Sequence, residues 1–332
     1  MKRYKVIYIF ILALTVLVAC GNSTNTANQP EEVDTDIKAP EFNGDSAFAY
    51  VKAQCDFGPR VPNSTAHTQC GDWLVAKFKE FGATVTEQKA TLRGWDGTAL
   101  NMRNIVASYK PEARKRVIIC SHWDSRPWAD NDPDEKNHHT PIDGADDGAS
   151  GVGIMVELAR QLQLQETEVG IDLICFDLED YGTPQWYNGK HDENSWCLGS
   201  QYWAHSPHTE GYNARFGILL DMVGNANARF YKEYFSQKMA SGIVSKVWKK
   251  AHKLGVGAYF PKSEGGAITD DHLPINNVAR IPCIDIIPQY PTCEQSSFGP
   301  IWHTVNDNIS NIDKSTLKVV GQVLMEVIYN EK

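Results

Sequence analysis

Two kinds of hydrophobic pattern alternate along the chain after residue 40. Short continuous runs of apolar residues, rich in β-branched and aromatic side chains, are typical of strands buried on both faces. Segments in which apolar and polar residues alternate predict strands with one exposed face. The continuous runs are Arg116–Ser121, Ile171–Asp177, Phe216–Asp221 and Ile281–Ile287, and the alternating segments, expected to pair as antiparallel strands, are Thr84–Arg93 and Asn101–Tyr109.

Other segments carry apolar residues three and four positions apart, which is the spacing of one face of a helix. Gly255 is placed to end one of these helices, and Ser315 is placed as the N-cap of the last. The predicted helices are Ser46–Gln54, Thr65–Phe81, Ala149–Gln163, Met239–Leu254 and Ser315–Tyr329.

The alternation of strands and helices favours an α/β fold, with a mixed, mostly parallel central sheet flanked by helices. Residues 41–332 are many for one domain, but this length is normal for a single α/β enzyme. We therefore expect a single catalytic domain over 41–332.

The first residues predict an export signal rather than part of the fold. A basic start is followed by an apolar stretch from Val6 to Ala19 that is too short for an ordinary membrane span. Leu17-Val18-Ala19-Cys20 resembles the bacterial lipobox, which implies a signal peptide over 1–19 and a lipid on Cys20. The alternative is an ordinary signal peptide with an incidental cysteine. Residues 20–40 are polar and predict a flexible tether, so we expect a lipid-anchored protein of a bacterial cell envelope, facing the periplasm.

Charge and cysteine content argue against some kinds of partner and metal site. The net charge of −9, without a basic run, argues against a nucleic-acid partner. The domain has seven cysteines, an odd number, so at least one thiol is unpaired, and no C-x-x-C spacing supports a cysteine zinc site. We expect a monomer.

Acids and histidines follow several of the predicted strands. His122 and Asp124 come directly after the run that ends at Ser121, and Asp221 ends another run. Side chains two residues apart in an extended segment point to the same side, so this pair could ligate a metal, with the carboxylate orienting the imidazole. A loop histidine beside a solvated aspartate is the alternative interpretation.

Two pairs of adjacent acids extend this pattern. Asp146-Asp147 opens a predicted helix, where carboxylates also cap the helix and complement its dipole, so both interpretations stay open. Glu179-Asp180 follows a buried strand, where adjacent carboxylates are costly unless something positive compensates them. Open α/β sheets place their active sites at the carboxyl ends of strands, and Asp, Glu and His are zinc ligands. The pattern therefore predicts a zinc site there.

In order, spacing and flanking residues, these motifs resemble the zinc aminopeptidase fold family. That family carries H-x-D, G-A-D-D-x-x-S-G, an acidic pair, D-M-x-G and a late histidine, which is His303 here. The resemblance runs from Phe57-Gly58-Pro59-Arg60 to the final helix and implies a largely parallel sheet between helices. It implies Asp147, Asp180 and His303 as zinc ligands, Glu179 as general base, and His122 and Asp221 as ligands of a second zinc where one is present.

Within this family the chain is more similar to glutaminyl cyclases than to peptidases. Trp302 stands directly before His303, as in cyclases, where that tryptophan walls the substrate pocket. Asp270 adds an acid to the Asp271-His272 motif and matches a cyclase carboxylate that hydrogen-bonds the one matched by Asp221. Trp186 lies near the position of a pocket tryptophan of animal cyclases. The acidic pair is Glu-Asp rather than the Glu-Glu of animal cyclases, which suggests a bacterial branch.

The cyclase resemblance implies one zinc per chain and the cyclisation of N-terminal glutamine in peptides and proteins to pyroglutamate, with release of ammonia. Zinc would polarise the γ-carbonyl, and Glu179 would carry a proton from the α-amine to the departing ammonia. Asp221, with Asp270, would steady the amine. The substrate side chain would be clamped by Trp302, Trp186 and Phe298.

Two other classes of function remain at this point. A two-zinc aminopeptidase would use His122 and Asp221 for its second metal and Glu179 to activate a bridging water. A peptide-binding lipoprotein with an inactive enzyme fold is the third hypothesis, and the presence of every expected ligand and of the base argues against it.

Overall fold

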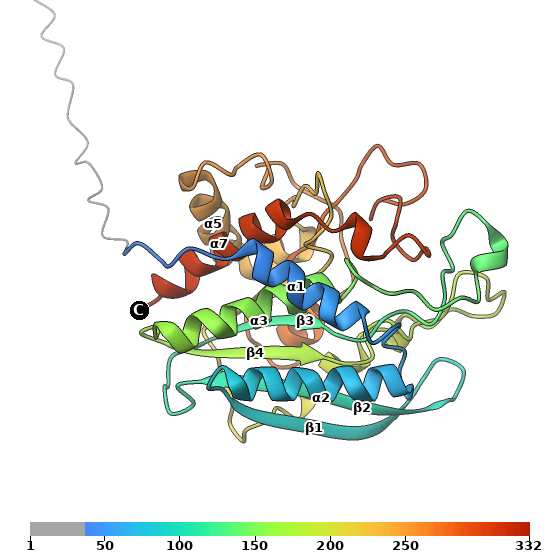
Figure 1. The fold of residues 1–332 in the computed structure, drawn as a ribbon, viewed down its shortest axis with the longest axis horizontal. Helices are drawn as coiled ribbons and strands as arrows, with labels where there is room; N and C mark the ends of the chain where they lie inside the picture. Colours follow the sequence, from blue (N-terminus) through green and yellow to red (C-terminus); the bar gives the residue numbers. More distant parts are fainter. Residues whose placement is uncertain (1–36) are drawn as a thin grey trace, which may run out of the picture. The chain divides into compact units, whose positions relative to one another are not determined.

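The computed structural model describes residues 37–332. The predicted signal peptide over 1–19, Cys20 and most of the predicted tether lie outside the described residues. Within them, Ile37 donates a backbone hydrogen bond to Asn330 Oδ1 at 2.7 Å, and Ala39 is buried. The last residues of the segment predicted as a tether are therefore packed on the domain, beside its C-terminal helix (Figure 1).

One sheet of six strands forms the centre of this domain, in the order β1-β2-β4-β3-β5-β6. The four strands β4, β3, β5 and β6 run parallel, and β2 pairs antiparallel with both β1 and β4. The strands are β1 (Thr84–Arg93), β2 (Ala99–Tyr109), β3 (Arg116–His122), β4 (Gly170–Phe176), β5 (Phe216–Leu220) and β6 (Cys283–Ile286). The predicted mixed, mostly parallel sheet is confirmed.

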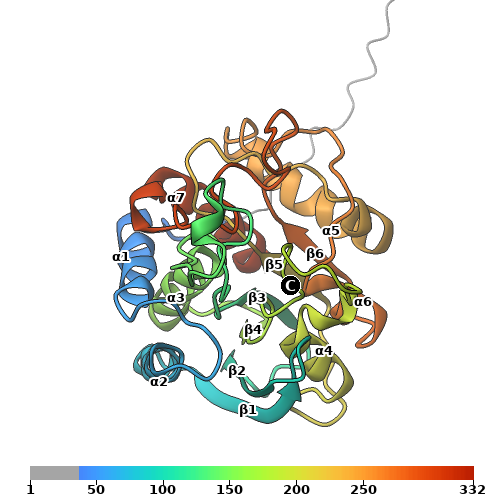
Figure 2. The same cartoon turned by 90° about the vertical axis from the view of Figure 1, so that its right-hand side faces the viewer.

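Helices cover both faces of the sheet, as Figure 2 shows for α1, α3 and α7 on one side and α4 and α6 on the other. The larger core lies under α1, α2, α3, α5 and α7, and the smaller core lies under α4 and α6. The helices are α1 (Gly44–Cys55), α2 (Thr65–Glu80), α3 (Ala149–Leu164), α4 (Leu198–His205), α5 (Tyr234–Lys253), α6 (His272–Asn277) and α7 (Lys314–Tyr329).

Successive residues of the central strands enter opposite cores, which explains their continuous apolar runs. In β3, Val117 and Ile119 join the larger core, whereas Ile118 and Cys120 join the smaller one. Every residue of β3 and of β4 is buried. A strand covered on both faces has no polar side, so the alternation seen in exposed strands is lost.

Helix starts differ most from the sequence prediction. Helix α5 begins at Tyr234 rather than Met239, because the Glu233 carboxylate caps it by accepting hydrogen bonds from the backbone of Phe235 and Ser236. The N-cap of α7 is Asp313 rather than Ser315, whose backbone N–H donates to it at 3.0 Å. The short helices α4 and α6 were not predicted.

The described residues contain no helix that is long and apolar enough to cross a membrane. All seven cysteines between residues 37 and 332 are free thiols. Because β3, β4, β5 and β6 are parallel, their carboxyl ends share one edge of the sheet, and the loops that follow β3 and β4 extend beyond it (Figure 1).

Candidate metal centre and its pocket

The predicted ligands gather at this carboxyl edge of the sheet. His122 is the last residue of β3, and Asp221 is the first residue after β5. Glu179 and Asp180 lie in the loop after β4, and Asp147 lies just before α3. Since β3 lies between β4 and β5, the three strand ends deliver these side chains side by side. The loop before α7 adds His303.

Asp147, Asp180 and His303 form one compact group of buried ligand atoms. His303 Nε2 lies 3.6 Å from Asp147 Oδ2 and 3.3 Å from Asp180 Oδ1. Asp147 Oδ2 and Asp180 Oδ2 are buried without a hydrogen-bond partner among the described residues. Unpaired buried carboxylate oxygens are costly unless a cation compensates them. Two carboxylates and one imidazole are a ligand set that zinc accepts, with a fourth position left open.

His122, Asp147 and Asp221 form a second group, which shares Asp147 with the first. His122 Nε2 lies 3.0 Å from Asp147 Oδ1 and 3.3 Å from Asp221 Oδ1. The structure therefore brings together both ligand sets that the sequence suggested. Geometry alone permits one metal or two.

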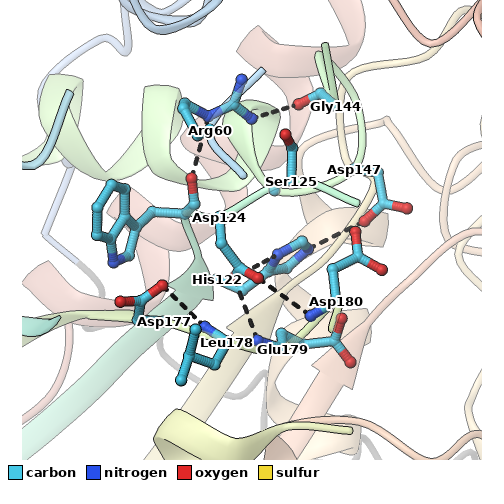
Figure 3. Close-up of polar contacts among 12 residues, drawn as sticks. Arg60, His122, Asp124, Ser125, Gly144, Asp147, Asp177, Leu178, Glu179 and Asp180 are labelled. Carbon is cyan, nitrogen blue, oxygen red and sulfur yellow. Dashed lines mark hydrogen bonds and ion pairs between the residues drawn. The ribbon is translucent and has the colours of Figure 1, made fainter. Parts of the chain in front are cut away.

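Two buried aspartates hold the backbone of the ligand loops in place. Asp124 accepts hydrogen bonds from the backbone N–H groups of Glu179 and Asp180, both at 3.2 Å, and its Oδ1 lies 3.5 Å from His122 Nδ1 (Figure 3). Asp307 accepts from the backbone of Asp146 at 2.7 Å and Asp147 at 3.1 Å. Asp124 thus lies beside the imidazole as expected and also positions the acidic pair. The role of Asp307 was not predicted.

The Asp146-Asp147 pair does not cap α3. Gly148 occupies the N-cap position with a φ of 93° and without a side-chain cap hydrogen bond. A Cβ atom there would lie 2.9 Å from both His122 Cε1 and the Asp124 carbonyl oxygen, so the close approach requires glycine. The Asp147 side chain contacts His122 instead of capping α3, so the capping interpretation is wrong.

Arg126 and Asp130 support His303 and were also not predicted. Arg126 is fully buried and pairs with both oxygens of Asp130, through Nε at 2.8 Å and Nη2 at 2.6 Å. Asp130 Oδ1 lies 3.2 Å from His303 Nδ1, and Arg126 Nη1 donates to the Asp180 carbonyl at 2.8 Å. The guanidinium also stacks 4.5 Å from the Trp196 ring centroid. Arg126 therefore connects two candidate ligands with one aromatic side chain.

A cavity of about 310 Å³ opens over the acids. Trp302 stacks on His303 with ring centroids 3.8 Å apart, and Phe298 packs on Trp302 at 4.9 Å. The residues that line the cavity fall into a polar group and an apolar group. The polar group includes His303, Asp147, Glu179, Asp180, Asp221, Asp270 and Glu193, and the apolar group includes Trp302, Phe298, Trp196, Met222, Ile268 and Ile287.

The expectation that Trp186 clamps the substrate in the cavity is wrong. Trp186 does not line the cavity but packs in a separate aromatic cluster, with ring centroids 6.2 Å from Trp95 and from Trp128. Trp196, ten residues further along the same loop, lines the cavity instead and is stacked parallel to His303 at 6.1 Å. The loop lacks hydrophobic periodicity, so its sequence did not show which tryptophan faces inward.

Burial and neighbouring charges shift the pKa values of the acids of the site in different directions. Burial, with the charge of Asp180, raises the pKa of Glu179 well above its usual range and that of Asp147 to about 7. Burial would raise the pKa of Asp180 as well, but His303 and Arg126 hold it below its usual range. The pKa of Glu179 is thus raised while that of the adjacent Asp180 is lowered, which suits a group that exchanges protons beside a ligand that stays ionised.

Asp221 and Asp270 line the same cavity, but the expected hydrogen bond between them is not observed. Asp270 Oδ1 accepts from the backbone of Asp271 at 2.6 Å, and Asp270 Oδ2 is buried without a partner among the described residues. Asp221 Oδ1 contacts His122 instead. Burial, with the charge of Asp221 as the next cause, raises the pKa of Asp270 well above its usual range. The relationship between the two acids is therefore electrostatic in this structure.

The sequence and the fold are similar to those of known zinc-dependent enzymes. The model of peptidase family M28 matches residues 104–328. The glutaminyl cyclase of Bacteroides thetaiotaomicron, solved bound to N-acetylhistamine, is 60% identical, with a TM-score of 0.87 over 89% of this chain and 100% of that chain. A Zn-dependent exopeptidase from Parabacteroides distasonis is 52% identical, with a TM-score of 0.87 over 88% of this chain and 100% of that chain.

A curated relative is more distant. An aminopeptidase of Bacillus subtilis is 28% identical over 301 residues, which are 88% of this chain and 58% of the relative. The chain spans about three fifths of the length of the first curated relatives that it matches. The matched family model includes β3 to β6 and every predicted metal ligand. The expected relationship to the zinc aminopeptidase fold is thus confirmed, and the chain belongs to peptidase family M28.

Proposed function

We propose that this protein is a zinc-dependent glutaminyl-peptide cyclotransferase that converts N-terminal glutamine of peptides and proteins to pyroglutamate and releases ammonia. The observation that carries the proposal is the cavity wall, where Trp302 lies against His303 while Glu179, Asp221 and Asp270 face the same small space. A cavity of about 310 Å³ accommodates one side chain and an amine better than a long peptide segment. The similarity to solved glutaminyl cyclases, including that of Tannerella forsythia at 52% identity, supports it.

Asp147, Asp180 and His303 would hold the zinc ion, which would supply a Lewis acid for the glutamine γ-carbonyl. Glu179 accepts a proton from the substrate α-amine, which attacks the γ-carbon, and returns a proton to the leaving ammonia. Its raised pKa suits a group that must both take up and release a proton. Asp221 and Asp270 line the same cavity and would steady the amine during the reaction.

The aromatic walls restrict the substrate to a reactive geometry. Trp302 and Phe298 pack on each other beside His303, and the Trp196 ring lies nearly parallel to the same imidazole with the ring centroids 6.1 Å apart. Trp196, Phe298 and Trp302 all line the cavity and would form a slot for the glutamine side chain. Holding the amine near the γ-carbonyl in this slot lowers the entropic cost of ring closure.

A two-zinc aminopeptidase is the second candidate, and one specific observation favours it. His122 and Asp221 converge on Asp147, which would place Asp147 between two metals. In that case Glu179 would activate a water molecule rather than the substrate amine. The extra carboxylate Asp270 has no role in this alternative.

One paired assay separates the two candidates. The metal content of purified protein is measured, and ammonia release from a Gln-initiated peptide is compared with hydrolysis of a Leu-anilide. The cyclase proposal requires one zinc per chain and ammonia release. Two tightly bound zinc ions with anilide hydrolysis, and no ammonia, would establish the aminopeptidase.

We further propose that the protein acts as a monomer at the bacterial cell envelope, held by a lipid on Cys20 and facing the periplasm. The lipobox-like sequence before Cys20 supports this location, as does the polar composition of the residues that follow. Peptides and proteins with N-terminal glutamine would meet the enzyme there, outside the cytoplasm.

A further inference from the structure

The thiol of Cys197 lies against the side chain of Glu179. Cys197 Sγ donates to Glu179 Oε1 at 3.2 Å, and the Cys197 backbone N–H donates to the Glu179 carbonyl at 3.0 Å. Cys197 is only 3% exposed and has a left-handed backbone with a φ of 56°. A residue other than glycine in this conformation is uncommon. The backbone contact and the side-chain contact both hold the Cys197 sulfur beside Glu179.

Asp270 completes a group of three donors around this point. Single ligand atoms of Glu179, Cys197 and Asp270 all lie within 4.8 Å of one another. Asp270 is 4% exposed, and its Oδ2 atom has no hydrogen-bond partner among the described residues. Ligand atoms on one tetrahedral zinc lie about 3–4 Å apart, given bond lengths of about 2.0–2.3 Å. The three donors therefore need only small side-chain movements to share one ion.

We propose that Glu179, Cys197 and Asp270 form a separate binding site for a thiophilic divalent cation, such as excess Zn²⁺ or Cd²⁺, and that its occupation inhibits the enzyme. This site shares no residue with the ligand groups built on Asp147. An ion reaches it from the cavity, which Glu179 and Asp270 line, with the Cys197 sulfur behind them. As the metal–sulfur bond forms, the thiol proton leaves to solvent and no oxidant is required.

Ligand type makes the site selective. One thiolate with two carboxylates favours zinc or cadmium over magnesium or calcium, which prefer oxygen ligands alone. Occupation removes the Glu179 carboxylate from proton transfer, so the inhibition, unlike the binding, rests on the proposed function of Glu179. Since the cation and the substrate amine would use the same cavity, inhibition should weaken as the concentration of Gln-peptide increases.

Cobalt substitution tests the site by spectroscopy. The purified full chain is stripped of metal under reducing, anaerobic conditions and titrated with Co²⁺. Cobalt bound to thiolate gives an intense near-ultraviolet charge-transfer band, which carboxylate and imidazole ligands do not give. We expect the first equivalent to bind without this band and a weaker, later equivalent to produce it. Cys197→Ser should remove the band, whereas Cys293→Ser, which removes a partly exposed thiol, should keep it.

Excess Zn²⁺ provides the functional measurement. Each variant is compared with its own activity at one zinc per chain, and Cys197→Ser should require at least about tenfold more Zn²⁺ for half-inhibition. A wild-type protein without the charge-transfer band at saturating Co²⁺, or a band that persists in Cys197→Ser, would overturn the proposed site. A band without inhibition of an active enzyme would overturn the inhibitory role. Absence of any cyclase activity would instead count against the proposed function, and the absorption band would still decide the binding site.

Discussion

Asp130 Oδ1 lies 3.2 Å from His303 Nδ1, on the side of the imidazole opposite to the nitrogen that faces the candidate metal ligands. Arg126 pairs with Asp130, and together with His303 it holds the pKa of Asp130 far below its usual range despite burial. Asp130 is therefore ionised and fixes the orientation of His303. A carboxylate in this position also makes the imidazole a stronger metal ligand.

Asp130→Asn should weaken zinc binding by about 10–100-fold, because the histidine loses its orienting charge while the side chain keeps its shape. Competition with a chelator of known affinity measures this change. Glu135→Gln, in an exposed position of the same loop, is the matched control and should bind zinc normally. Equal zinc affinity in Asp130→Asn and in the parent protein would show that Asp130 does not support the ligand.

Glu179→Gln should retain zinc and the fold but lose about 10²–10⁴-fold in turnover, because the amide cannot exchange a proton. The amide oxygen can still accept the Cys197 hydrogen bond, so local structure is preserved. Zinc content and ammonia release from a Gln-peptide are measured on the same sample. Near-normal turnover in this variant would exclude Glu179 as the proton carrier.

Asp221 separates the two enzymatic interpretations. In a one-zinc cyclase, Asp221→Ala should leave zinc content unchanged while activity collapses, and Asp270→Ala should impair activity in a way that is not additive with it. In a two-zinc aminopeptidase, Asp221→Ala should empty one of two metal sites, and Asp270 should matter little. Metal analysis and ammonia release for both single variants and the double variant distinguish these outcomes.

The central strands and the ligands at their ends could be predicted from the sequence for one physical reason. A strand buried on both faces is mostly apolar, and a charged residue at its end marks where the chain leaves the core. β1 matches its predicted bounds, and His122 and Asp221 lie at the ends of β3 and β5. The short helices α4 and α6 have too few turns for a hydrophobic period to identify them.

Residues that act through long-range contacts could not be predicted in this way. Asp307 reaches the Asp147 backbone across 160 positions of sequence, and Arg126 contacts the Asp180 carbonyl across 54. Neither has a local pattern that distinguishes it from a solvated charge. Asp307 lies four residues after His303, and this proximity to a predicted ligand was the one available signal.

The proposed lipid anchor at Cys20 predicts that the protein is found in the membrane fraction of its cell. Cys20→Ala removes the sulfur that would carry the lipid, so the variant should move from the membrane fraction to the soluble fraction. Cys55→Ala, a thiol within the folded domain, is the control and should stay in the membrane fraction. Immunodetection in separated fractions measures the change. A Cys20→Ala protein that remains in the membrane fraction would contradict lipidation at this residue.

Asp285, in β6, predicts an unusual pH dependence of stability. Both of its carboxylate oxygens are buried without hydrogen-bond partners among residues 37–332. Burial, with the charge of Asp270 as the next cause, raises its pKa well above the usual range. The folded chain thus binds this proton more tightly than the unfolded chain. The stabilisation that results is fully present below the unfolded pKa of about 3.9 and is lost as the pH rises through the folded value.

Asp285→Asn keeps the shape of the side chain but cannot ionise. The free energy of unfolding of the variant, relative to the parent protein, should therefore increase between about pH 5 and pH 8. The gain should reach about 1–3 kcal/mol at the upper end, which is the usual cost of an unsatisfied buried polar group. Denaturant unfolding of both proteins across this range measures it, with the exposed Glu210→Gln as control. A difference that stays constant with pH, or that favours the parent at high pH, would show that Asp285 is already compensated in the folded protein.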